Sequence, residues 1–173
     1  MTSTRSRDAQ LCHALRTVVE WLPRLQEYPD DAQPRLNLML AALMSGHGSD
    51  HTGGGLAQAL SHAIGRRSPA PNGVVEALLL PHAMRFNAGV VGHRAAALAA
   101  GIPDSTGVSS AAVIDGIEKL SADFGVPKRL RDIGVTEDAL GEATEHAMDD
   151  WAITASPRVP DRDDVLELLT SAW

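Results

Sequence analysis

Apolar residues recur at helical spacing along most of this chain, and no segment alternates convincingly with the period of two that marks a strand. In residues 7–27, Leu11, Leu15, Val18, Val19 and Leu22 follow a period close to 3.6 residues, which predicts an amphipathic helix. Pro23 lies near the end of this stretch, where its ring is expected to bend or stop the helix.

The next apolar stretch runs from Pro34 through LNLMLAALM and is apolar on almost every side. Such a helix is expected to be central and buried. It enters GHGSDH and is predicted to break at Gly53–Gly55. A short third helix, LAQALSHAI, is expected to end at Gly65, because glycine is favoured just past helix ends.

Residues 74–87 predict a fourth helix with Pro81 as an internal kink; a buried strand at 74–80 is the alternative, because short apolar runs are ambiguous by periodicity. Further helices are predicted over 90–101 and 109–125, from Thr136 onward, and from Asp161 to the C-terminus. The last two begin with acidic residues, which the helix dipole favours in a first turn. The pattern predicts an all-α fold: a single helical bundle over residues 1–173.

Composition limits the function classes. Aromatic residues make up 3% of the 173 residues against 44% hydrophobic residues, so the core must consist of closely packed aliphatic side chains. The net charge of −7 argues against a nucleic-acid partner. One cysteine excludes an intrachain disulfide and favours a cytoplasmic protein. No apolar run approaches 18 residues, so no membrane segment is expected.

Three polar residues at helical spacing, His47, Asp50 and His51, form the first candidate site. His47 and His51 are four positions apart and Asp50 lies three from His47, so all three can share a helical face. Two imidazoles and a carboxylate can bind a divalent metal, or act as a base with its orienting partner in a metal-free pocket. A solvated surface remains the third interpretation, because the surrounding glycines weaken the helix.

Four segments of the chain carry short motifs: LLLPHAMRFN at 78–87, VPKRLRDIGVTEDAL at 126–140, the SPR…DVLELLTSAW ending, and a glycine-broken helix pair with its following loop. The last of these contains Gly46, Gly53, Gly55, Leu56, His62, Gly65, Pro71 and Gly73. In their order along the chain they resemble the C-terminal helical domain of the iron-containing alcohol dehydrogenases and the related maleylacetate reductases. LLLPHAMRFN is similar to that family's LLPHVMRFN-type helix, residues 126–140 to its connector, and the ending to its C-terminal helix. The resemblance covers nearly all of residues 10–173.

The resemblance implies a domain that closes one side of an active-site cleft, beside a nicotinamide-binding α/β domain. It also implies a metal held by one aspartate and three histidines. Two of these ligands would precede residue 1, and the other two positions match Gln58 and Asn72. Amide oxygens are poor substitutes for imidazole at an iron or zinc site, so no metal is expected here.

His62 matches a family histidine that lies beside nicotinamide and substrate. Gln58 and His62 are four residues apart and project from one helical face. Because imidazole exchanges protons near neutral pH, His62 is a candidate catalytic residue together with His51 and Asp50, whereas a histidine that only supports packing is the alternative. Gln58, Asn72 and His47 are the candidate substrate-binding residues.

Two kinds of function follow. The first is a metal-free, oxidoreductase-derived protein acting on a small carbonyl, hydroxyl or carboxylate compound. In that case the chain binds no cofactor by itself, and a separate subunit supplies NAD(P). The second is a repurposed domain that binds or converts a small molecule without nicotinamide or metal, through His62 and the His47/Asp50/His51 cluster. A homo-oligomer or a heteromer is expected in either case, because a face once packed on another domain would be apolar; a degenerate protein that merely binds a partner is a third option.

Overall fold

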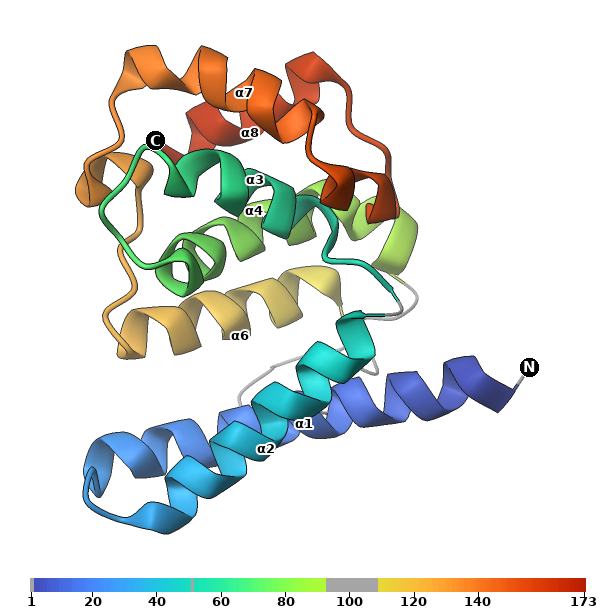
Figure 1. The fold of residues 1–173 in the computed structure, drawn as a ribbon, viewed down its shortest axis with the longest axis vertical. Helices are drawn as coiled ribbons and strands as arrows, with labels where there is room; N and C mark the ends of the chain where they lie inside the picture. Colours follow the sequence, from blue (N-terminus) through green and yellow to red (C-terminus); the bar gives the residue numbers. More distant parts are fainter. Residues whose placement is uncertain (1, 51, 93–108) are drawn as a thin grey trace. The chain divides into compact units, whose positions relative to one another are not determined.

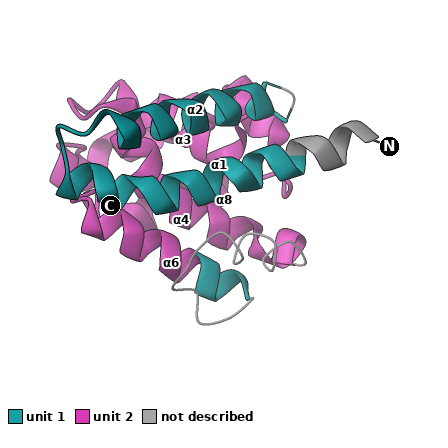
Figure 2. Cartoon of the chain, turned by 90° about the horizontal axis from the view of Figure 1, so that it is seen from below, with its two compact units in different colours: residues 1–53, 94–113 teal, residues 54–93, 114–173 magenta. Residues whose placement is uncertain are grey.

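The computed structural model describes residues 2–50, 52–92 and 109–173 (Figure 1). In these ranges the chain forms helices joined by loops and short 3-10 turns, with no strand, so the predicted all-α fold is confirmed. The residues group into two compact units, 1–53 with 94–113 and 54–93 with 114–173, coloured teal and magenta in Figure 2. That residues 1–173 form one domain stays a prediction.

The first unit contains helices α1 (Thr2–Glu27) and α2 (Ala32–Ser49), which pack against each other. Helix α1 continues past Pro23 for four more residues. Asp31 caps α2 by accepting a hydrogen bond from the Gln33 amide at 2.9 Å. A methyl group at Gly48 would collide with the Leu11 side chain, so this glycine lets the two helices approach closely.

Helix α2 is not the central, buried helix that its composition predicts. It buries Pro34, Ala41 and Gly48, whereas Leu36, Met39, Leu40 and Leu43 are 48–70% exposed. These four residues recur at helical spacing and form an exposed apolar face of α2. The prediction was wrong because a helix that is apolar all round still needs partners on every side, and within its own unit α2 packs mainly on α1.

The second unit is built around α3 (Gly55–Gly65), which contacts α4 (Asn72–Val91), α7 (Leu140–Met148) and the 3-10 turn η4 (Trp151–Ala155). Figure 1 shows α3 between α4 and α7. Seven of its eleven residues are buried. Ala59, Leu60 and Ile64 have no exposed surface, and Val75 and Leu79 of α4 share their core. The short, glycine-bounded helix is therefore the central one.

Helix α4 contains the predicted fourth helix, so the alternative strand at 74–80 is wrong. Among the described residues it is the one helix long and apolar enough to cross a membrane, with a mean hydropathy of 1.2 and a third of the window buried. Val75 and Leu79 of this helix belong to the core of the second unit. A buried core helix passes the same test, so the composition alone is weak evidence for a membrane segment.

Short 3-10 turns precede α7 in the second unit. After α6 (Ser110–Asp123), two 3-10 turns, η2 (Leu130–Ile133) and η3 (Glu137–Ala139), lead into α7. Thr136 precedes η3 rather than α7, so the predicted seventh helix begins as a 3-10 turn. The helix predicted over 90–101 falls mostly outside the described residues.

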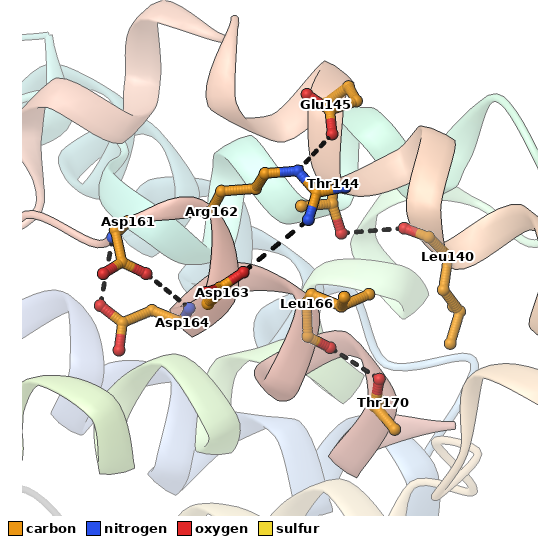
Figure 3. A network of polar contacts seen from close by, with 9 residues as sticks. All are labelled: Leu140, Thr144, Glu145, Asp161, Arg162, Asp163, Asp164, Leu166 and Thr170. Carbon is orange, nitrogen blue, oxygen red and sulfur yellow. Dashed lines mark hydrogen bonds and ion pairs between the residues drawn. The ribbon is translucent and has the colours of Figure 1, made fainter.

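The last helix, α8 (Arg162–Ala172), begins as the acidic residues predict. Asp161 accepts from the Asp164 amide at 2.8 Å, and the Asp164 carboxylate accepts from the Asp161 amide at 3.1 Å (Figure 3). This reciprocal capping box satisfies two amide groups that the helix itself leaves unpaired. Arg162 ties the same turn to α7 through Glu145 at 2.6 Å.

The packing of α3 predicts where the fold is most sensitive. Leu60→Ala should lower the free energy of unfolding by about 2–5 kcal/mol, because it opens a cavity at a position with no exposed surface. Val159→Ala, at a side chain 76% exposed, is the matched control and should change it by less than about 0.5 kcal/mol. Denaturant unfolding followed by circular dichroism measures both, and equal losses would contradict this core.

Candidate functional site

One face of α3 carries Gln58, His62 and Gly65, which are spaced at i, i+4 and i+7. The buried residues of α3 face the core of the second unit, so Gln58, His62 and Gly65 lie at the edge of that core. The helix starts where Gly53 and Gly55 adopt φ values of 73° and 68°, a left-handed region that favours glycine. The glycine break therefore sets where α3 begins and which residues it turns toward the core.

His62 is paired with Asp150, which lies directly before η4. The His62 Nδ1 atom is 2.8 Å from Asp150 Oδ2, and the two side chains are 37% and 16% exposed. The other carboxylate oxygen, Oδ1, accepts from the Ala152 amide at 2.8 Å and caps η4. Because a carboxylate oxygen accepts, Nδ1–H donates, and the Nε2 atom of His62 is left for a ligand.

The far end of η4 is also fixed. Ser156 follows η4, and its hydroxyl donates to the buried Asn87 Oδ1 at 3.3 Å. The same oxygen accepts from the Arg158 amide at 3.0 Å. Asn87 of α4 thus anchors the segment whose first residue, Asp150, holds His62. The dyad is supported from both ends of the turn.

A second histidine, His146, lies with His62 on the lining of one cavity. Arg67, only 10% exposed at its side chain, donates to His146 Nδ1 at 2.8 Å and to the Ala63 carbonyl at 2.7 Å, and pairs with Glu142 at 3.2 Å. A guanidinium has no acceptor atom, so Nδ1 of His146 accepts and its Nε2 carries the hydrogen. The two rings therefore offer one acceptor and one donor.

The cavity measures about 400 Å³ and lies between α3 and the segment from α7 to η4. Its polar groups are the two histidines, Arg66, Asp149 and Asp150, and Trp151, which is 66% exposed, gives it an apolar wall. This volume and a few convergent polar groups suit a small ligand. An acceptor, a donor and a guanidinium can together bind a hydroxyl or carbonyl group that carries a nearby carboxylate.

Gln58 and Asn72 are not among the residues that line this cavity. The Gln58 side chain folds back over Gly54, where a methyl group would overlap it. Asn72 is exposed at the start of α4, and its Oδ1 would lie 2.6 Å from a Cβ atom at Gly65. Both side chains lie beside α3, on the face that His62 shares, but the structure does not bring them into the His62 cavity.

This donor set does not fit the metal that the resemblance implies. Of Gln58, His62 and Asn72, only His62 offers an imidazole. The amide oxygens of the other two are uncharged and are weak ligands for iron or zinc. Nowhere in the described part of the chain do three histidine, cysteine, aspartate or glutamate side chains gather as a possible metal site. No step of a reaction is therefore assigned to a metal here.

The structure describes two of the three residues of the His47/Asp50/His51 cluster. His47 is exposed on α2, where its Nδ1 lies 3.3 Å from Gln10 Nε2. Asp50 is exposed just after the same helix. His51 lies outside the described residues. His47 and Asp50 belong to the first unit and His62 to the second, so a shared pocket stays a prediction.

Sequence reasoning missed three residues of this site. Asp150 pairs with His62 and Glu142 pairs with Arg67, although the sequence analysis singles out neither acidic residue. His146 had no partner pattern, and its contact with Arg67 spans 79 positions. The one local signal was the position of Asp150 ahead of Trp151–Ala155, which is typical of a capping residue but does not reveal a histidine 88 positions away.

An all-α fold with His62 on a short helix that follows a glycine break is what the sequence motifs indicate. The whole chain, residues 1–173, matches the Fe-containing alcohol dehydrogenase family, C-terminal. The chain therefore belongs to the C-terminal domain of the iron-containing alcohol dehydrogenase and maleylacetate reductase family.

Individual proteins with similar sequences support the same family. Lactaldehyde reductase of Escherichia coli K12 is 32% identical over 141 residues, covering 79% of this chain and 37% of that protein. The 1,3-propanediol dehydrogenase of Citrobacter freundii is 29% identical over 171 residues, covering 96% and 44%. The chain thus spans less than half the length of these relatives.

Solved structures of relatives show the same fold. A 1,3-propanediol oxidoreductase superposes with a TM-score of 0.91 at 28% identity, over 97% of this chain and 45% of that one. Maleylacetate reductase from Rhizobium sp. strain MTP-10005 gives a TM-score of 0.80 at 25% identity, over 96% and 45%. The family and its fold are thereby shown for this chain.

The donor set predicts how the protein handles metals. Purified protein incubated with Fe²⁺ or Zn²⁺ and desalted should retain no stoichiometric metal, because Gln58 and Asn72 replace imidazoles. Elemental analysis measures the content. One tightly bound ion per chain, lost on Gln58→Ala or Asn72→Ala, would contradict the prediction. An ion lost only on His47→Ala or His51→Ala would instead place a metal site in the His47/Asp50/His51 cluster.

Proposed function

We propose that this chain supplies the helical part of a metal-free oxidoreductase site, in which His62 exchanges a proton with the oxygen of a small hydroxyl or carbonyl substrate. The observation that supports it most directly is the 2.8 Å contact from His62 Nδ1 to Asp150 Oδ2. A carboxylate on one ring nitrogen fixes the tautomer and orientation of the ring, which leaves the other nitrogen to take or give a proton.

The groups around His62 suggest the substrate class. A carbonyl oxygen needs a hydrogen-bond donor and a hydroxyl hydrogen needs an acceptor; His146 Nε2 and His62 Nε2 offer both at one cavity. Arg66, on the same lining, can hold a carboxylate. The names of two relatives, lactaldehyde reductase and 1,3-propanediol dehydrogenase, refer to compounds of this size. A small aldehyde, alcohol or hydroxycarboxylate is the proposed substrate.

The cavity does not fit a nicotinamide dinucleotide by itself. It measures about 400 Å³, near the lower end of the range for sites that take drug-sized ligands. The hydride acceptor is therefore assigned to a dinucleotide-binding subunit that binds NAD(P), and only the proton step is assigned to this chain. A cytoplasmic location is part of the same proposal.

A second candidate function needs no nicotinamide. The His62–Asp150 pair contains in itself the groups for acid–base chemistry, so the domain alone could bind or convert a small molecule. The two candidates differ in their cofactor requirement: the first is inactive without NAD(P) and a partner, whereas the second proceeds with this chain alone.

The dyad gives the first functional test. His62→Ala should lower turnover of lactaldehyde or 1,3-propanediol about 10²–10⁴-fold, the usual contribution of a positioned acid–base group. Asp150→Asn should lower it less, because Asn still accepts from the Ala152 amide but no longer offers an ionised oxygen to His62. NAD(P)H-linked rates are measured in extracts of the native host deleted for this chain and supplemented with each variant.

Asp163→Asn is the matched control, since it removes an aspartate charge at a side chain 94% exposed on α8. Its rate should equal that of the unchanged protein, and the melting temperatures of all variants should agree within a few degrees. If His62→Ala unfolds the protein and the rate per folded molecule stays the same, His62 is structural and the proposal fails.

The exposed apolar face of α2 supports the proposed association with a partner subunit or a second copy. Leu36, Met39, Leu40 and Leu43 form a continuous apolar stripe, and such stripes usually mark interaction sites. Leu40→Glu combined with Leu43→Glu should shift the protein to the monomer in sedimentation or light scattering. Val159→Glu, at an exposed apolar side chain outside α2, should not. A strictly monomeric parent protein that co-purifies with no other chain would contradict the proposal.

A further inference from the structure

Lysine is rare in this chain. Of its 15 lysine and arginine residues, only Lys119 and Lys128 are lysines. Both line one cavity of about 340 Å³ in the second unit, although they are nine positions apart in the sequence. Every other basic side chain is an arginine, so the chain's whole supply of ammonium groups, apart from its terminus, is at this lysine cavity.

The lysine cavity is separate from the His62 cavity and shares no lining residue with it. It lies between α4, α6 and the connector that follows α6. Its apolar wall consists of Ala77, Leu78, Pro81, Ala122, Val126 and Pro127. The polar groups are His82, Glu118, Ser121 and the two lysines. An apolar wall with a few polar groups is typical of a small-molecule site.

His82 presents an acceptor to the lysine cavity. Ser171 Oγ donates to the Leu168 carbonyl at 2.8 Å, so its own hydrogen is engaged. The 3.2 Å contact between His82 Nδ1 and Ser171 Oγ is therefore donated by the ring, and Nε2 keeps a lone pair. Burial, followed by the nearby Arg85, lowers the pKa of His82, whereas Glu118 has the opposite effect. The lowered pKa favours the neutral ring.

The charge balance of the lysine cavity is positive. Glu118 is its one carboxylate, and it is engaged with Arg85 at 2.7 Å, just outside the lining. Lys128 is exposed and makes no hydrogen bond or ion pair within the described part of the chain. Lysine offers a compact, mobile ammonium group that suits an anionic oxygen on a small ligand.

We propose that the lysine cavity is a second ligand site that binds a small hydroxycarboxylate. The carboxylate interacts with the ammonium groups of Lys119 and Lys128, and the hydroxyl donates to His82 Nε2. The short carbon chain lies on the wall formed by Pro81 and Val126. This site is distinct from the proposed acid–base site, so its occupation does not require that His62 be catalytic.

The two lysines make the test specific. Protein grown with ¹³C-labelled lysine gives only two lysine side-chain environments, and their Cε signals report directly on the lysine cavity. Titration with 2-hydroxybutyrate should shift both signals saturably, whereas the neutral 1,2-butanediol should not. In Lys128→Gln, the dissociation constant read from the remaining Lys119 signal should rise by at least about tenfold, the usual loss when a hydrogen bond to a charged group is removed.

Arg129→Gln is the matched control, because it removes an exposed positive charge one residue further along that does not line the cavity. It should bind 2-hydroxybutyrate as the unchanged protein does. In His62→Ala the two lysine Cε signals should shift as in the unchanged protein, because they report on the lysine cavity and not on the His62 cavity. His82→Leu should weaken the binding of 2-hydroxybutyrate more than the binding of butyrate, because only 2-hydroxybutyrate has a hydroxyl group that can donate to His82.

Three results would overturn the proposal. The first is a lysine shift that never saturates, or that chloride reproduces at equal ionic strength. The second is equal weakening by Arg129→Gln and Lys128→Gln, which would reduce the effect to overall charge. The third is tighter binding of inorganic phosphate than of 2-hydroxybutyrate, which would show an anion site without the proposed carbon-chain specificity. Circular dichroism of each variant confirms that it is folded.

Discussion

The burial of α3 is the constraint on which the rest of the second unit depends. This eleven-residue helix has Ala59, Leu60 and Ile64 wholly buried and contacts α4, α7 and η4 at once. Isolated helices this short are marginal in water, so tertiary packing and not propensity stabilises it. Because its core face is fixed in this way, the orientation of the remaining face, with His62, is fixed as well.

That orientation gives the candidate site its chemistry. His62 is neither free nor buried without a partner: Asp150 holds one ring nitrogen, and Asp150 is itself held by the amide of η4. Arg67, in the turn that follows α3, likewise holds one ring nitrogen of His146. Each imidazole is thus fixed in one tautomer by a neighbouring group, which is what acid–base chemistry and hydrogen-bonded recognition both require. Gln58 and Asn72, the two positions that match family metal ligands, carry amide side chains instead of imidazoles.

The His62 cavity and the lysine cavity differ in electrostatic character. The lining of the His62 cavity contains Asp149 and Asp150 beside one arginine, whereas that of the lysine cavity contains two ammonium groups and a carboxylate engaged with an arginine. They share no element: one lies along α3 and η4, the other along α4 and α6. A protein with net charge −7 has thus concentrated both its lysines at one small cavity.

The sequence by itself determined what depends on neighbours along the chain. Helical periodicity, the acidic capping box of Asp161 and Asp164, the glycine break before α3 and the family motifs around His62 are all local patterns, and the structure agrees with them. Tertiary structure alone decided that α3 and not α2 is the buried helix, because burial depends on how many elements surround a helix. It also decided that Asp150 and His146 meet α3 across 88 and 79 positions, since contacts over such separations are set by helix packing and leave no periodic signal in the sequence.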